Sequence, residues 1–134
     1  MTRERFQKRP RATPRAAPND AGAFEEELRK IELRLDLVSA AGRASFVDGS
    51  TSFDHATVAI LRLAALLERG SRFAQFFEAA TDDEKRGIAT TRNIAAHVGY
   101  ASMDLDAFWH TMTVDVPVFI AKIREVNHLP RSGQ

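Results

Sequence analysis

The chain has no cysteine, no long apolar run and no strand-like alternation of residues. The lack of cysteine excludes disulfides and thiolate metal sites, and it fits the cytoplasmic location that we expect. A membrane-spanning helix needs about 20 predominantly apolar residues. The longest apolar-rich piece, "HATVAILRLAALLERG", is interrupted by Arg62 and Glu68, so no membrane contact is expected. Without alternation or an internal repeat, the pattern favours an all-helical protein.

The charge of the chain is unevenly distributed. Its 134 residues suggest one domain, and 44% apolar with 28% charged residues is ordinary for a globular protein. The net charge of +1 hides a basic start, because residues 1–18, "MTRERFQKRPRATPRAAP", hold six basic residues and one acidic residue. Residues 19–134 hold 13 basic and 17 acidic residues. With three prolines and few large apolar residues, residues 1–20 are predicted to form a disordered basic tail.

Two interpretations of this tail stay open. It could contact the phosphates of RNA or DNA through counterion release, or it could be a solubilising extension or a wrongly assigned start. The tail lacks the apolar segment of a secretory signal, and the absence of serine sets it apart from a transit peptide. The other end, residues 129–134, is also predicted to be disordered.

Between these ends, residues 21–128 are predicted to form one helical domain. Helices are expected from residue 19 or 20 to Gly42, from about 52 to 69, from Thr81 through the stretch "TTRNIAAHVGY", and from 102–104 to about 126. A short helical piece is expected in "SRFAQFFEAA". Thr81 and Glu84 have the spacing of a capping box, and Pro117 should kink the last helix. The predicted fold is an all-α bundle of four main helices plus a short helix.

The third helix carries the candidate site. At 100° per residue, Ile88, Thr91, Ile94, Ala95 and Val98 form one predicted core stripe, and Arg92, Asn93, His97 and Tyr100 fall on the other half. Asn93 and His97 are i,i+4 neighbours, and His97 and Tyr100 are i,i+3 neighbours. Arg92 and His97 are about 140° apart. They can converge only if the long arginine reaches round, the helix bends or a second subunit completes the site.

These residue types suit one reaction well. Histidine can give and take protons near neutral pH, and arginine stabilises charge on a phosphate. Asparagine can orient a hydroxyl or the imidazole. Together they suit cleavage of RNA by its own 2′-hydroxyl, which needs proton transfer and a stabilised phosphorane but no metal. The alternative is a polar helix face that is merely solvated.

The motifs around this helix resemble the HEPN superfamily, in particular the HepT-like toxins of HEPN/MNT toxin–antitoxin pairs. That pattern is Arg-Asn-x3-His, a nearby Tyr, and then "D…W…DLP" in the next helix. The resemblance covers roughly residues 24–126. The chain departs from it after the histidine: many HepT proteins have His-x-Tyr, whereas here two residues separate His97 from Tyr100. The matching residues are Phe46, Asp48, Arg92, Asn93, His97, Tyr100, Asp104, Trp109, Asp115, Val116 and Pro117.

The resemblance implies a two-fold homodimer that acts as a metal-independent endoribonuclease, with no cofactor. It makes His97 the acid–base group and Arg92 the partner of the phosphate or transition state, and Asn93 would position the substrate or the histidine. It also implies a nucleotidyltransferase antitoxin of the MNT type, which in some pairs adenylylates a tyrosine at the place of Tyr100. The alternatives are a catalytically inactive HEPN-type module that binds RNA, a nucleotide or a partner, and a helical scaffold.

Other chemically notable residues are given structural roles. Trp109 and Phe108 are expected in the core or a dimer interface, and "FAQFF" is expected to be core or dimer contact. His55 and His110 lack partners at metal-ligand spacing, so both are expected to be surface histidines. Glu68 is interpreted as a solvated charge.

Overall fold

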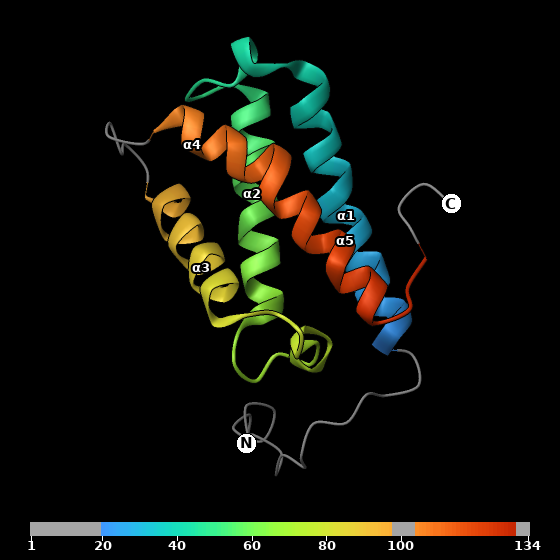
Figure 1. Ribbon diagram of the computed structural model, residues 1–134. Coiled ribbons are helices and arrows are strands. Elements are labelled where there is room, and N and C mark those ends of the chain that lie inside the picture. Colours follow the sequence, from blue (N-terminus) through green and yellow to red (C-terminus); the bar gives the residue numbers. More distant parts are fainter. Residues whose placement is uncertain (1–19, 98–103, 131–134) are drawn as a thin grey trace, which may run out of the picture.

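The computed structural model describes residues 20–97 and 104–130, and all regular structure in these ranges is helical (Figure 1). The all-α prediction is therefore confirmed. Residues 1–19, Tyr100 and residues 131–134 lie outside the described residues. The elements are α1 (Asp20–Ala41), η2 (Arg43–Ser45), α2 (Thr51–Leu67), η3 (Ala74–Phe77), α3 (Asp82–Ala96), α4 (Leu105–His110), the π-helical turn η4 (Thr111–Asp115) and α5 (Val116–Val126).

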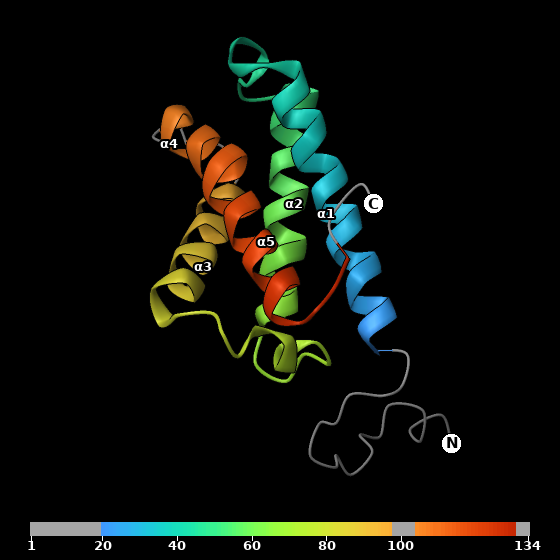
Figure 2. The same cartoon turned by 45° about the vertical axis from the view of Figure 1, so that its right-hand side comes forward.

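The helices α1 and α2 form a long hairpin at the centre of the fold (Figures 1 and 2). Every third or fourth residue of α1 is buried, as the apolar stripe predicts. The turn between the helices uses Asp48-Gly49, where the φ of Gly49 is 85° and only glycine adopts this conformation easily. Ser50 then caps α2 by accepting a hydrogen bond from the backbone N–H of Phe53 at 3.0 Å.

One continuous run of α4, η4 and α5 crosses the hairpin diagonally (Figure 1). Its buried side is formed by Phe108, Met112, Val116, Phe119, Ile120 and Ile123. Pro117 has no N–H to donate to the carbonyl of Thr113, one turn back. The predicted perturbation therefore takes the form of a π-helical turn just before the proline, which then sits in the first turn of α5.

The helix α3 is much less buried than the others. It lies at the edge of the bundle, beside α2 and on the side away from α1 (Figures 1 and 2). Ile88 is the one residue of α3 that is buried, whereas Ile94 is 39% exposed. The predicted core stripe is therefore wrong at Ile94, which lines a small hollow between the end of α3 and α4 and stays open to solvent. The capping box of Thr81 and Glu84 is confirmed.

Aromatic rings fill the two ends of the core. Phe24 stacks on Phe76 with ring centroids 4.4 Å apart and meets Phe77 edge-on at 5.3 Å. At the other end, the rings of Phe46 and Trp109 lie 5.4 Å apart. The core roles predicted for "FAQFF", Phe108 and Trp109 are confirmed.

Residues next to both predicted domain boundaries make contacts with the helical domain. Asp20, assigned to the tail, begins α1, is buried and pairs with Arg72. Leu129 and Pro130, assigned to a disordered end, are held in place, because Leu129 packs on the core and the carbonyl of Pro130 accepts a hydrogen bond from Arg124 at 2.6 Å. The sequence pattern could not predict these contacts, because each depends on a partner far away in the chain or on the buried arginine.

Candidate functional site

The last turn of α3 presents the three catalytic candidates, Arg92, Asn93 and His97, which we call the polar cluster. All three are exposed. The capping box fixes where α3 begins, and Ile88 fixes which side faces α2. The periodicity of the helix then places Asn93 about 140° from Ile88, whereas Arg92, one turn on from Ile88, lies about 40° from it.

Two hydrogen bonds join the polar cluster, and both involve Asn93. The Nη1 of Arg92 donates to the side-chain oxygen Oδ1 of Asn93 at 3.0 Å. The Nδ1 of His97 lies 2.5 Å from the backbone carbonyl oxygen of Asn93. The predicted i,i+4 neighbourhood of Asn93 and His97 is confirmed, although the contact is made with the backbone of Asn93.

His97 stands just beyond the helix. The last residue of α3 is Ala96, and His97 is the C-cap with φ −90° and ψ 104°. The prediction had placed His97 on the helical face together with Tyr100, but the helix has already ended at that point. Tyr100 lies outside the described residues, so its relation to His97 stays a prediction.

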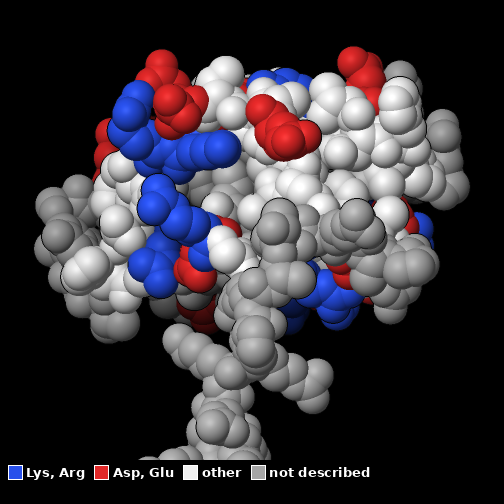
Figure 3. Space-filling view, turned by 90° about the horizontal axis from the view of Figure 1, so that it is seen from below, with Lys and Arg blue, Asp and Glu red and all other residues white. Residues whose placement is uncertain are grey.

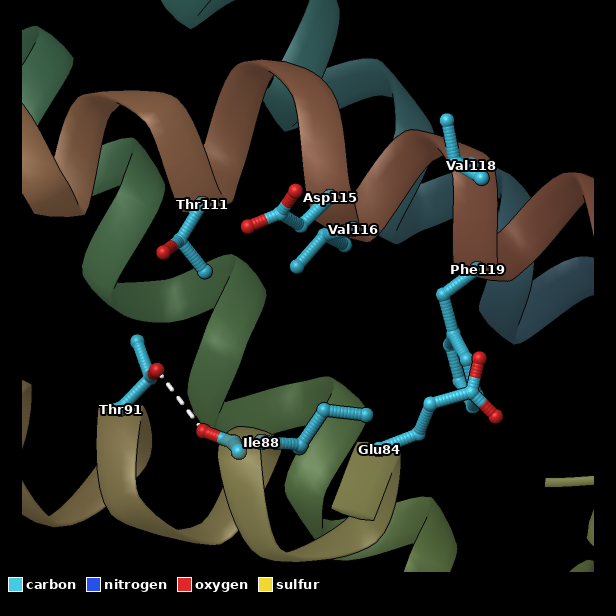
Figure 4. A pocket seen from close by; sticks show the side chains of 9 residues that line it. Glu84, Ile88, Thr91, Thr111, Asp115, Val116, Val118 and Phe119 are labelled. Carbon is cyan, nitrogen blue, oxygen red and sulfur yellow. Dashed lines mark hydrogen bonds between the residues drawn. The ribbon is translucent and has the colours of Figure 1, made fainter. Parts of the chain in front are cut away.

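The polar cluster is on an open surface. A groove of about 440 Å³ does lie along α3, between this helix and η4–α5 (Figure 4). Its lining includes Gly87, Ile88 and Thr91 from α3, but none of the three residues of the polar cluster. An exposed turn on one side of a helix cannot enclose a small molecule, so the polar cluster suits a large substrate or a site completed by another surface.

The polar groups of the groove already have partners within the chain. Thr91 donates a hydrogen bond to the carbonyl of Gly87 at 2.8 Å (Figure 4), and His110 lies 3.5 Å from Asp115. Lys122 of α5 reaches across to Glu84 at 2.7 Å. This hydrogen bond from Lys122, together with the backbone hydrogen bond from Thr81, holds the pKa of Glu84 below its ordinary value of 4.5. The groove is therefore bridged by an ion pair and is not a concentration of unpaired charge.

Charges of both signs are also mixed at the lower end of the bundle. In Figure 3, basic side chains lie directly beside acidic ones on this face. Ion pairs of this kind include Arg72–Asp20 and Arg86–Asp83. On this face, the described charges of the two signs lie close together and partly compensate each other.

Sequence reasoning missed one prominent charged group, the buried Arg124 of α5. It is bonded to Glu32 at 2.6 Å and to Glu25 at 3.0 Å, and these acids raise the pKa of Arg124 further. Burial opposes ionisation of Glu25, but the hydrogen bond from Arg124 and the attraction of Arg29 outweigh it, so its pKa lies below 4.5. The signal in the sequence was the position of Glu25 and Glu32, two turns apart on the edge of the apolar stripe of α1.

The remaining candidates have the surroundings expected of them. His110 has a largely exposed side chain, and Glu68 is exposed at the C-cap of α2. His55 is half-buried on α2, so its surface assignment is only partly right. Over residues 20–97 and 104–130, no three His, Asp or Glu side chains gather as metal ligands would. Within the same ranges, no helix is both long and apolar enough to cross a membrane.

Comparisons with known proteins add no relative to this picture. The chain was compared with protein-family models, curated proteins and solved structures, and it matches none of them.

Proposed function

We propose that this protein is a metal-independent endoribonuclease of the HepT type, the toxin of a toxin–antitoxin pair. The observation that carries the proposal is the polar cluster itself, in which Arg92 and His97 are both hydrogen-bonded to Asn93 on an exposed turn. The open position of the cluster supports a polymeric substrate. The motifs that run from Arg92 to Pro117 support the family.

In the proposed reaction, the 2′-hydroxyl of a ribose attacks the adjacent phosphorus atom. A base removes the proton of that hydroxyl, and an acid gives a proton to the departing 5′ oxygen. The products are a 2′,3′-cyclic phosphate and a free 5′-hydroxyl. His97 transfers protons, and the guanidinium of Arg92 stabilises the extra negative charge on the phosphorane.

The reaction needs both a base and an acid, and each chain brings one histidine to the cluster. We therefore propose a homodimer in which His97 and Arg92 of two subunits face the same cleft.

The proposed protein partner is an MNT-type nucleotidyltransferase that acts as the antitoxin. Tyr100 is the residue that such an enzyme would adenylylate. Modification three residues after His97 would place a bulky anionic group next to the site and exclude RNA by charge repulsion.

The test combines expression of the protein alone with cleavage of purified RNA. Expression should arrest growth, and the purified protein should leave 2′,3′-cyclic phosphate ends in the presence of EDTA. His97→Ala should lower cleavage about 10²–10⁴-fold and Arg92→Ala about 10²–10³-fold. Matched controls are His110→Ala, another exposed histidine, and Arg86→Ala, another exposed arginine of α3; both should cleave normally.

Two results would overturn the proposal. One is full toxicity and cleavage by the His97→Ala variant. The other is RNA binding by the intact chain with no cleavage in any preparation, which would indicate a catalytically inactive binding module.

A further inference from the structure

The end of α3 determines how the ring of His97 is held. In a continuing helix, the backbone N–H of residue 97 would donate to the carbonyl of Asn93. Here that N–H donates to the carbonyl of Ile94 instead, at 3.3 Å. The Asn93 carbonyl, one of the four that a helix leaves at its C-terminus, is taken over by the ring of the same residue, His97.

This contact has one chemical consequence for the imidazole. A carbonyl oxygen only accepts hydrogen bonds, so a hydrogen bond between it and Nδ1, 2.5 Å away, requires a proton on Nδ1. In the neutral ring, the nitrogen without a proton is then Nε2. A hydrogen bond at one ring nitrogen fixes the tautomer and the orientation of the other, as in other acid–base histidines.

We infer that Nε2 of His97 is the atom that gains and loses the proton, and that the backbone carbonyl of Asn93 is its positioning group. Asn93 thereby has two separate roles: its backbone orients His97 and its side chain holds Arg92. The inference deepens the proposed ribonuclease function and rests on it for its chemical meaning. The tautomer itself can be measured whether or not the protein cleaves RNA.

The experiment is a long-range ¹H–¹⁵N correlation spectrum of the full-length protein with ¹⁵N-labelled histidine, recorded across a pH series. The four histidines of the chain include His97, whose signals are assigned by their loss in His97→Gln. The expected result is that neutral His97 carries its proton on Nδ1 and that its Nε2 is not protonated. A neutral ring with its proton on Nε2 would overturn the inference.

Two variants separate the backbone of Asn93 from its side chain. Asn93→Ala keeps the carbonyl, so the tautomer of His97 should stay the same although Arg92 loses its partner. An ester in place of the peptide bond between Asn93 and Ile94 makes the Asn93 carbonyl a weaker acceptor, so the Nδ1-protonated form should lose its dominance. An ester between Ala89 and Thr90, in the same helix, is the control and should leave the tautomer unchanged.

These outcomes are distinct from failure of the proposed function. Cleavage that depends on His97, combined with a proton on Nε2, would refute the assignment of the nitrogen and leave the ribonuclease proposal standing. A proton on Nδ1 without any cleavage would refute the ribonuclease proposal alone. A tautomer that changes in Asn93→Ala would show that the side chain, and not the carbonyl, positions the ring.

Discussion

The guanidinium of Arg92 donates a hydrogen bond to the side-chain oxygen of its neighbour Asn93, 3.0 Å away. His97, just beyond the end of the helix, contacts the backbone carbonyl of the same Asn93. Asn93 therefore contacts Arg92 through its side chain and His97 through its backbone.

The first prediction concerns this orientation of Arg92. Asn93→Ala keeps the positive charge of Arg92 but removes the hydrogen bond that orients its guanidinium. The kcat/KM for RNA cleavage should therefore fall about tenfold. That is the size expected from loss of one hydrogen bond to a charged group, about 1.5 kcal/mol. Arg92→Ala should cost more, because the charge itself is lost. Equal losses in the two variants would contradict an orienting role for the Asn93 side chain.

The second prediction concerns the buried Arg124. Arg124→Met would remove the buried cation that Glu25 and Glu32 share and leave Glu25 with Arg29 alone, so the free energy of unfolding should fall by about 3–5 kcal/mol. Urea denaturation followed by circular dichroism measures this. The control is Arg86→Met, which removes an ion pair that is exposed on both sides and should change stability by less than about 1 kcal/mol. Indistinguishable effects of the two substitutions would mean that burial does not strengthen the Arg124 pair.

The third prediction is a loss of stability in acid. The pKa of Glu25 is lower in the folded protein than its ordinary value of 4.5, so its charge stabilises the fold above that pH. The stabilisation is lost as the pH falls through the folded pKa. The difference in unfolding free energy between the native chain and Glu25→Gln should therefore be largest near neutral pH and shrink below pH 4.5. A difference that stays constant over a pH series of urea titrations would argue against this linkage.

The fourth prediction concerns the local stability of α3. Since Ile88 is its one buried residue, α3 should exchange its amide hydrogens faster than the internal turns of α1 and α2. Thr81→Ala removes the capping box at a cost of about 1 kcal/mol and should speed exchange in α3 alone. Thr90→Ala, which changes an exposed threonine of the same helix, should not. Uniform protection of all three helices would show that α3 is more firmly held than its burial implies.

The sequence predicted local features of the fold well and distant contacts poorly. The stripe of α1 and the capping box of α3 depend on residues within a few turns, so periodicity and spacing were enough. The contact of Arg124 with Glu32 joins residues 92 positions apart and follows no local pattern. The exposure of Ile94 likewise depends on the path of another helix.

The candidate site shows the same difference between features that local spacing predicts and features that it does not. The i,i+4 spacing correctly placed His97 beside Asn93. It could not show that the backbone carbonyl would be the partner, because that depends on the helix ending at Ala96. The end of a helix is decided by small differences between competing hydrogen bonds, which residue identities alone do not rank.

The sparse burial of α3 has a genetic consequence. Almost every position of this helix can be changed with little effect on folding, whereas Ile88 and the interiors of α1 and α2 cannot. A selection for survivors that have lost toxicity should therefore recover two separable classes of mutant. One class would contain well-folded proteins at normal abundance, changed at the polar cluster, and the other would contain proteins depleted from the cell by degradation. Immunoblotting of such survivors would distinguish variants with a changed polar cluster from variants that fail to fold, before any protein is purified.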